Sequence, residues 1–279
     1  MMRNLTLAVV ASVVMGGCLP WEKPAPVWQF KSLAAAQAHR DTVESLLLHK
    51  AGLTAFPEEL TAYPKLQRVS LRQNKIEALP PSIARMKSLA LLDVGQTGLR
   101  ALPPEIGALA GLTTLYVNDN RLAALPPEIG MLRSLCYLNA DHNQLAGLPD
   151  SAGQMKSLRW LRLNDNQLTE LPAAVGSLAN LQRLYVADNS LAALPPELAK
   201  LTALTDLVLS RNRLAVLPAW IGRMTALERL SLEGNRLAVL PDELASLPNL
   251  KWIRLENNEL PAAEKARWKE KLPQVTLIF

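Results

Sequence analysis

Leucine recurs with a period of 23 residues along most of the chain. The repeated pattern is Leu-x-x-Leu-x-Leu-x-x-Asn-x-Leu, as in Leu158–Leu168. A proline stands six residues after each asparagine position, for example Pro149 after Asn143. Ten such units run from Val43 to about Leu260, which makes this stretch a tandem array of one structural unit.

Each unit predicts one short strand and one turn. The Leu-x-Leu alternation is typical of a strand with both leucines on the same face. The proline then ends strand pairing and starts a turn on the opposite side, where Ile106, Ile129 and Val175 are expected to pack inward from short helical turns. Stacked units therefore predict a curved α/β solenoid, with a parallel β-sheet on its concave side and short helical turns on its convex side.

The asparagine of each unit predicts a ladder of hydrogen bonds. An asparagine side chain can both donate and accept, so it can satisfy backbone groups where the chain leaves the strand. Thr97 and Ala51 stand at two of the ten positions, and threonine can replace only part of this bonding whereas alanine can replace none. The ladder asparagines are Asn74, Asn120, Asn143, Asn166, Asn189, Asn212, Asn235 and Asn258.

Both ends of the array carry sequences that are suited to cover it. Residues 31–42 predict an N-terminal capping helix, with Ser32 as its N-cap and an amphipathic pattern from Leu33 to Glu44. Residues 261–279 predict a C-terminal cap, with a helix over Ala262–Lys271 and a strand over Val275–Phe279 that pairs with the last unit. Such caps protect the open edges of a parallel sheet from aggregation.

The complete repeat, with Leu-Pro-x-x-Ile-x-x-Leu after the asparagine, looks like the 23-residue leucine-rich repeat of Ras-suppressor and Scribble-type proteins. Similar repeats occur in bacterial surface proteins. The resemblance covers about four-fifths of the chain. It implies a leucine-rich repeat horseshoe, but it says little about function because the repeating residues are the ones that build the core.

The N-terminus predicts export and a lipid anchor. Arg3, an apolar run from Leu5 to Val14 and small residues after it are typical of a signal peptide over residues 1–17. Met15-Gly-Gly-Cys18 resembles the lipobox of bacterial lipoproteins, which implies that the Cys18 thiol receives a lipid. Residues 18–30, rich in proline, then form a semi-rigid tether. We expect a lipid-anchored protein of the bacterial cell envelope, with Leu19 after the cysteine favouring the outer membrane by the same resemblance.

Composition narrows the functional classes. A net charge of +5, with 20% charged and 5% aromatic residues, fits a folded protein and gives no sign of nucleic-acid binding. Asp141 and His142 lie near Cys136, but parallel strands hold side chains in open rows and form no pocket that excludes water. We therefore expect a monomer that is not an enzyme and holds no cofactor.

Function is expected to depend on the side chains between the strand leucines, since these face the concave side in columns about 4.8 Å apart. Three of the four tyrosines and Trp160 fall there, in the middle of the arch. Exposed aromatic residues with polar tips favour a protein-binding surface. The predicted partner-binding residues are Tyr116, Asn118, Tyr137, Asn139, Asp141, Trp160, Arg162, Asn164 and Tyr185.

The acidic residues beside the ladder could contact basic groups of a partner or bind a cation. Asp119, Asp165 and Asp188 form a row whose charges repel, and basic groups on the partner would relieve that repulsion. A calcium site is disfavoured because a flat row does not provide converging ligands. Two alternatives to the protein-binding function stay open: a structural envelope protein without a dedicated partner, and a carbohydrate binder. The outer charges, such as Arg121, Arg213 and Arg236, are expected to form a solvated face, with a basic stripe that contacts anionic lipid as the alternative.

Overall fold

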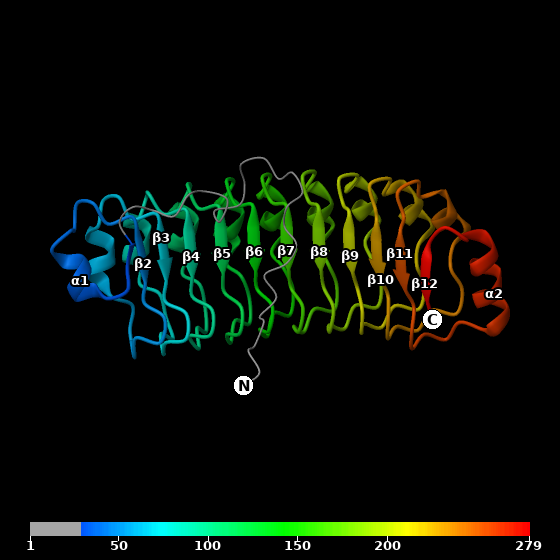
Figure 1. Ribbon diagram of the computed structural model, residues 1–279, viewed down its shortest axis with the longest axis horizontal. Helices are drawn as coiled ribbons and strands as arrows, with labels where there is room; N and C mark the ends of the chain where they lie inside the picture. Colours follow the sequence, from blue (N-terminus) through cyan, green and yellow to red (C-terminus); the bar gives the residue numbers. More distant parts are fainter. Residues whose placement is uncertain (1–28) are drawn as a thin grey trace, which may run out of the picture.

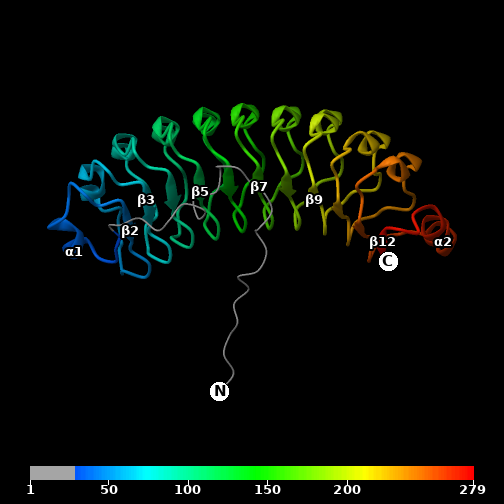
Figure 2. The same ribbon diagram turned by 45° about the horizontal axis from the view of Figure 1, so that its top comes forward.

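The computed structural model describes residues 29–279 as one curved solenoid. Twelve strands form a single sheet in the order of the sequence, and every neighbouring pair is parallel. Figure 1 shows the strands side by side in sequence order, and Figure 2 shows the sheet on the inner side of the arch with the short helical turns on its outer side. The predicted leucine-rich repeat horseshoe is therefore confirmed.

Ten strands, β2 to β11, belong to the ten repeats and have three residues each. Successive strands are aligned in register one repeat apart, so that Tyr137 pairs with Trp160 and Trp160 pairs with Arg183. The strands are β1 (Gln29–Phe30), β2 (Ser45–Leu47), β3 (Arg68–Ser70), β4 (Leu91–Asp93), β5 (Thr114–Tyr116), β6 (Tyr137–Asn139), β7 (Trp160–Arg162), β8 (Arg183–Tyr185), β9 (Asp206–Val208), β10 (Arg229–Ser231), β11 (Trp252–Arg254) and β12 (Thr276–Ile278).

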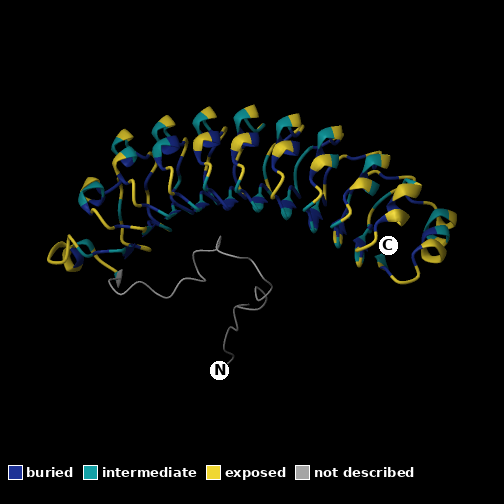
Figure 3. Cartoon of the chain, turned by 90° about the horizontal axis from the view of Figure 1, so that it is seen from above, coloured by how far each residue is buried: buried dark blue, intermediate teal, exposed yellow. Residues whose placement is uncertain are grey.

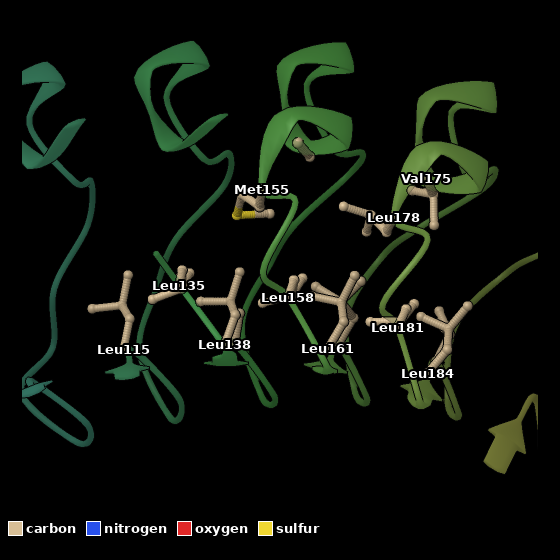
Figure 4. Packing of buried hydrophobic residues seen from close by; sticks show 14 of the residues in the cluster. Leu115, Leu135, Leu138, Met155, Leu158, Leu161, Val175, Leu178, Leu181 and Leu184 are labelled. Atoms are coloured by element: carbon tan, nitrogen blue, oxygen red, sulfur yellow. The ribbon is translucent and has the colours of Figure 1, made fainter. Parts of the chain in front are cut away.

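The core is a continuous stack of the repeat leucines. The middle residue of each strand points into it, and Leu115, Leu138 and Leu184 are 0% exposed. Figure 4 shows these leucines in rows, with Leu135 and Leu158 in the layer behind them. Burial of each such side chain contributes about 1.5–3 kcal/mol, and only stacking provides it, because one repeat alone cannot cover its own leucines.

The outer turns are 3₁₀ helices of five residues. Each begins after the repeat proline, whose backbone is extended, for example Pro149 with φ −70° and ψ 147°. Adjacent turns pack so closely that a Cβ on Gly153 would lie 2.3 Å from the carbonyl oxygen of Ala174. The turns are η2 (Glu58–Ala62), η3 (Pro81–Arg85), η4 (Pro104–Ala108), η5 (Pro127–Met131), η6 (Asp150–Gln154), η7 (Ala173–Ser177), η8 (Pro196–Lys200), η9 (Ala219–Arg223) and η10 (Asp242–Ser246).

The N-terminal end differs from its prediction. Helix α1 covers only Leu33–Gln37, with the Ser32 hydroxyl accepting from the Ala35 amide at 3.2 Å. The helix stops early because the chain must turn into strand β2, and the amides of Thr42 and Val43 instead bond to the carbonyl of His39. Residues 29 and 30, assigned to the tether by the sequence, form strand β1 and pair with β2.

At the C-terminal end, helix α2 (Ala262–Lys271) lies over the last repeat and β12 pairs with β11. These elements stand where the sequence pattern predicts a helix and a strand. Trp268 of α2 is fully buried, and its Nε1 donates to Glu264 Oε1 at 2.8 Å. The last leucine-rich coil is thus covered by an apolar side chain whose polar atom is satisfied.

The asparagine ladder joins neighbouring repeats. Asn143 donates through Nδ2 to the carbonyls of Val117, Ala140 and Asp141 at 3.0–3.2 Å, and its Oδ1 accepts from the amide of Leu122 at 3.0 Å. Asn120 and Asn212 repeat the pattern one and three units away. Thr97 makes only part of it, donating to the carbonyl of Val94 at 2.8 Å.

Candidate partner-binding face

The concave face consists of three side-chain columns that cross strands β2 to β11. The first and third residues of each strand, and the residue two positions beyond the strand, point away from the leucine core. Figure 3 shows this inner surface as a mixture of buried and intermediate residues, whereas each outer turn also carries exposed residues. The concave face is therefore a tightly filled layer of side chains.

Three aromatic side chains form a continuous row at the centre of this face. The Tyr116 and Tyr137 ring centroids are 5.1 Å apart, and those of Tyr137 and Trp160 are 5.5 Å apart. The planes are inclined at 45° and 54°, as is common for aromatic pairs that avoid face-to-face stacking. We call Tyr116, Tyr137 and Trp160 the aromatic row.

The row is less exposed than the sequence indicates. Tyr137 is only 5% exposed, while Tyr116, Trp160 and Tyr185 are partly buried. Rings this close together on adjacent strands cover one another. The expectation that the central aromatics are all exposed is therefore wrong for Tyr137, whereas the other three residues retain accessible surface.

Burial also fixes the protonation state of these tyrosines. It raises the pKa values of Tyr116, Tyr137 and Tyr185 above the ordinary 10.0, and neighbouring groups modify the effect. The three phenols therefore stay neutral to a higher pH than an exposed tyrosine does. Each hydroxyl can serve as a hydrogen-bond donor as well as an acceptor.

The predicted polar residues on β6 and β7 bond to one another. Arg162 donates through Nε to Asp141 Oδ2 at 2.7 Å, and its Nη2 lies 2.6 Å from the same oxygen. The other carboxylate oxygen of Asp141 accepts from the Asn164 amide at 2.7 Å, and the Asp141 amide donates to Asn139 Oδ1 at 3.0 Å. This network holds the central polar side chains in one arrangement.

Asn118 and Asn164, further along the same column, also bond within the protein. Asn118 Nδ2 donates to Asp119 Oδ2 at 2.5 Å, and Asn164 Oδ1 accepts from the Ala187 amide at 2.8 Å. Asn118 Oδ1 is buried without a hydrogen-bond partner. Every predicted polar residue of the face thus lies on the concave side, and most of its bonding capacity is already used.

Two further arginines extend the aromatic row toward the C-terminal half of the arch. The guanidinium carbon of Arg183 lies 4.2 Å from the Trp160 ring centroid, and its Nε is 3.6 Å from Asp206 Oδ2. Arg229 donates to the same carboxylate from the other side. The sequence places these residues in one column with Trp160, but it gave no reason to select them because their pairing depends on side-chain conformation.

The residues directly before the ladder positions have left-handed backbone conformations. Asp119, His142, Asp165 and Asp188 have φ between 53° and 56°, a region that non-glycine residues rarely occupy. We call these four residues the rim. Such a conformation lets the chain turn inward so that the following asparagine points into the core, and the repeat pattern does not reveal it because only Gly234 marks the position with a glycine.

The rim carboxylates are paired within the chain. His142 Nδ1 lies 3.3 Å from Asp165 Oδ2, Arg72 Nη2 lies 3.6 Å from Asp119 Oδ2, and Arg211 forms an ion pair with Asp188. Arginine therefore offsets the charges of Asp119 and Asp188 within the chain, and Asp165 has His142 within contact distance. Among residues 29–279, no group of histidine, cysteine or acidic side chains is arranged to hold a metal ion.

The parallel strands, 3₁₀ turns and asparagine bonds define a repeat solenoid whose variable surface is its concave sheet. The family described as "Leucine-rich repeat region" matches residues 152–275, and the family described as "Leucine rich repeat" matches residues 110–168. The presence of leucine-rich repeats in this chain is thereby confirmed. The comparison with curated proteins found no match.

Solved structures share this fold. An internalin (inlF) from Listeria monocytogenes aligns with a TM-score of 0.76 at 20% identity, over 90% of this chain and 71% of that one. The ectodomain of the Arabidopsis receptor kinase HAESA, in complex with an IDA peptide hormone ligand, aligns with a TM-score of 0.67 at 29% identity. That alignment covers 79% of this chain and 38% of the receptor ectodomain.

A second receptor ectodomain from Arabidopsis, GASSHO1/SCHENGEN3 with CASPARIAN STRIP INTEGRITY FACTOR 2, aligns with a TM-score of 0.71 at 26% identity. The alignment covers 84% of this chain and 29% of that one. Within the described part of this chain, the helices are too short or too polar to cross a bilayer. The predicted lipidation site, Cys18, and the predicted signal peptide lie outside the described residues.

Proposed function

We propose that this protein is anchored to a membrane of the bacterial envelope and binds a protein partner on its concave face, centred on strands β5 to β8. The observation that carries the proposal is the aromatic row, which continues through Arg183 and has partly accessible aromatic side chains. Aromatic and arginine side chains at the centre of a surface are the residues that most often contribute binding energy.

The proposal fits a rigid receptor surface. The Arg162–Asp141–Asn164 network holds the polar side chains before any partner arrives, and such preorganisation lowers the entropic cost of binding. The HAESA ectodomain was solved with a peptide hormone ligand, and the GASSHO1/SCHENGEN3 ectodomain in complex with CASPARIAN STRIP INTEGRITY FACTOR 2. For this chain, that likeness supports a binding role but does not identify the ligand.

The ring geometry favours a protein over a carbohydrate. A sugar ring stacks on the open face of an aromatic ring, whereas the Arg183 guanidinium lies over the Trp160 ring at 4.2 Å and Tyr137 is 5% exposed. The purely structural alternative gives no reason for the aromatic residues to gather in four neighbouring repeats. Partner binding accounts for both the clustering and the partial exposure.

A crosslinking experiment in membranes tests the proposal. Tyr116, Trp160 and Tyr185 would be replaced together by alanine, and crosslinked neighbours would be captured and identified by mass spectrometry. Trp220→Ala is the matched control, because Trp220 is also partly buried but belongs to the outer turn η9. Loss of one specific captured protein in the triple variant alone supports the proposal. Loss of glycan retention instead supports the carbohydrate alternative, and no change supports the structural one.

The lipid anchor has its own test. Lipid attached to the sulfur of Cys18 excludes a disulfide at that sulfur, and Cys136 is the second of the two cysteines in the sequence. Mass analysis of the N-terminal peptide from membranes, without and with reduction, distinguishes the two fates. A diacylglycerol-modified Cys18 supports the anchor, whereas a reducible link between Cys18 and Cys136 refutes it.

A further inference from the structure

One buried carboxylate in the first concave column is shared by two arginines. Asp206 on β9 is 5% exposed and accepts from the Thr205 hydroxyl at 2.8 Å. Arg229 on β10 donates to it through Nε and Nη2, and Arg183 on β8 approaches the same carboxylate at 3.6 Å. We call Arg183 and Arg229 the arginine pair. Two guanidinium groups against one carboxylate leave this cluster with a net charge of +1.

The positively charged side chains are the most solvent-exposed part of this cluster. The side chain of Asp206 is 7% exposed, whereas those of Arg183 and Arg229 are 25% and 51% exposed. A molecule that approaches the concave face therefore meets N–H donors before it meets the carboxylate. Glu228, a second acid beside Arg229, is paired with Lys251, and Asp141 is paired with Arg162, so neither offsets the charge.

Aromatic side chains border the arginine pair on one side. The Trp160 ring lies against the Arg183 guanidinium at 4.2 Å, and Tyr185 stands on the same strand as Arg183. Arginine that is stacked on an aromatic ring keeps its planar fork available for a carboxylate, which it binds through two parallel hydrogen bonds. Positive charge and apolar surface are thus combined at the end of the aromatic row.

We infer that the arginine pair binds a carboxylate from an acidic segment of the protein partner, while Trp160 and Tyr185 contact an apolar side chain beside that carboxylate. The inference rests on the proposed function and adds the chemistry of the partner to it. The carboxylate of the partner neutralises the remaining charge of +1, which Asp206 alone does not balance. Recognition would then require an acidic residue adjacent to a hydrophobic one.

Synthetic peptides of defined charge test the inference on the full-length purified protein. The probes are three blocked decapeptides that alternate tyrosine with glutamate, glutamine or lysine, and fluorescence anisotropy measures their affinity. We expect the glutamate peptide to bind about tenfold more tightly than the glutamine peptide, as one charge-assisted bidentate contact allows, and the lysine peptide to bind most weakly. Raising the salt concentration should reduce the preference.

Variants assign the preference to the arginine pair. Arg183→Gln should abolish the roughly tenfold preference for glutamate, whereas Arg213→Gln, an exposed arginine after a ladder asparagine, should keep it. Asp206→Asn removes the competing carboxylate and should increase affinity for the glutamate peptide, a gain that simple structural damage would not produce. If Asp206→Asn lowers the melting temperature of the protein, the inference is judged from the peptide preference of Arg183→Gln alone.

Equal affinity for the three peptides, or an unchanged preference in Arg183→Gln, overturns the inference. The proposed function fails in a different experiment, because it predicts loss of the crosslinked partner when the central aromatics are replaced. If that loss occurs while peptide affinity does not depend on charge, partner binding stands and the acidic-segment inference falls. If the crosslinked partner is retained, the proposed function falls whatever the peptides show.

Discussion

Replacing Asn143 by alanine tests how strongly the asparagine ladder holds neighbouring repeats together. The variant removes four hydrogen bonds, but their loss is unequal. The amide of Leu122 is left without its acceptor in a residue that is 0% exposed. The carbonyl of Val117 keeps a second donor, Asn120 Nδ2 at 2.9 Å, and the carbonyl of Ala140 keeps Asn166 Nδ2 at 3.0 Å.

These contacts give the size of the effect. A buried amide without a partner costs about 1–3 kcal/mol, and each carbonyl that retains another donor loses less. We therefore expect Asn143→Ala to lower the free energy of unfolding by about 2–4 kcal/mol. Asn143→Thr should lose roughly half as much, since the Thr97 hydroxyl still donates to a strand carbonyl at its own position.

Urea unfolding followed by circular dichroism measures the change, and amide exchange at Leu122 reports it locally. Asn180→Ala is the control, because the exposed Asn180 side chain makes one hydrogen bond, to the carbonyl of Lys156 at 2.9 Å. We expect that control to change stability by less than about 0.5 kcal/mol. If Asn143→Ala and Asn180→Ala unfold at the same urea concentration, the ladder does not stabilise the solenoid as argued.

Three further predictions concern the turns and the tyrosines. Gly153→Ala places a Cβ 2.3 Å from a backbone oxygen of the next turn and should lower the free energy of unfolding, measured in thermal melts, by about 1–3 kcal/mol. Gly147→Ala is the control and should change the free energy of unfolding little, because the space around Gly147 is open. Gln73→Gly, at φ 61°, should raise stability by about 0.5–1 kcal/mol, and a lower unfolding midpoint would contradict this. Burial raises the pKa of all four tyrosines, Tyr63, Tyr116, Tyr137 and Tyr185, above 10.0. The stability that they contribute is therefore complete below about pH 10 and is lost as the pH rises through their folded-state pKa values. Tyrosinate absorbance, measured in native and in denatured protein, checks this prediction.

The repeat pattern predicts the backbone because each of its positions has one physical task. Leucine fills the core and asparagine bonds the backbone, as Leu138 and Asn143 show. The pattern is less informative at the ends, where there is no neighbouring copy to reinforce it. The amphipathic pattern after Ser32 predicts a helix to Glu44, but entry into β2 limits α1 to Leu33–Gln37.

The candidate site could be predicted only as a set of columns. The sequence places Tyr137, Trp160 and Arg183 in one column because strand register follows from the repeat length. It does not show which neighbours bury Tyr137 or which acid an arginine selects. These depend on side-chain conformations at distances of 3–6 Å, which a periodic pattern does not determine.

The same pairing explains which concave residues can discriminate between partners. Asp141 is saturated by Arg162 and the Asn164 amide, so a partner that bonded to it would have to break bonds of similar strength. Such residues set the shape of the face. Under the proposed function, discrimination then depends on the arginine pair and on the ring surfaces of Trp160 and Tyr185. A partner that carries a carboxylate beside an apolar side chain uses all of these at once, whereas a neutral or basic partner leaves the excess positive charge unpaired.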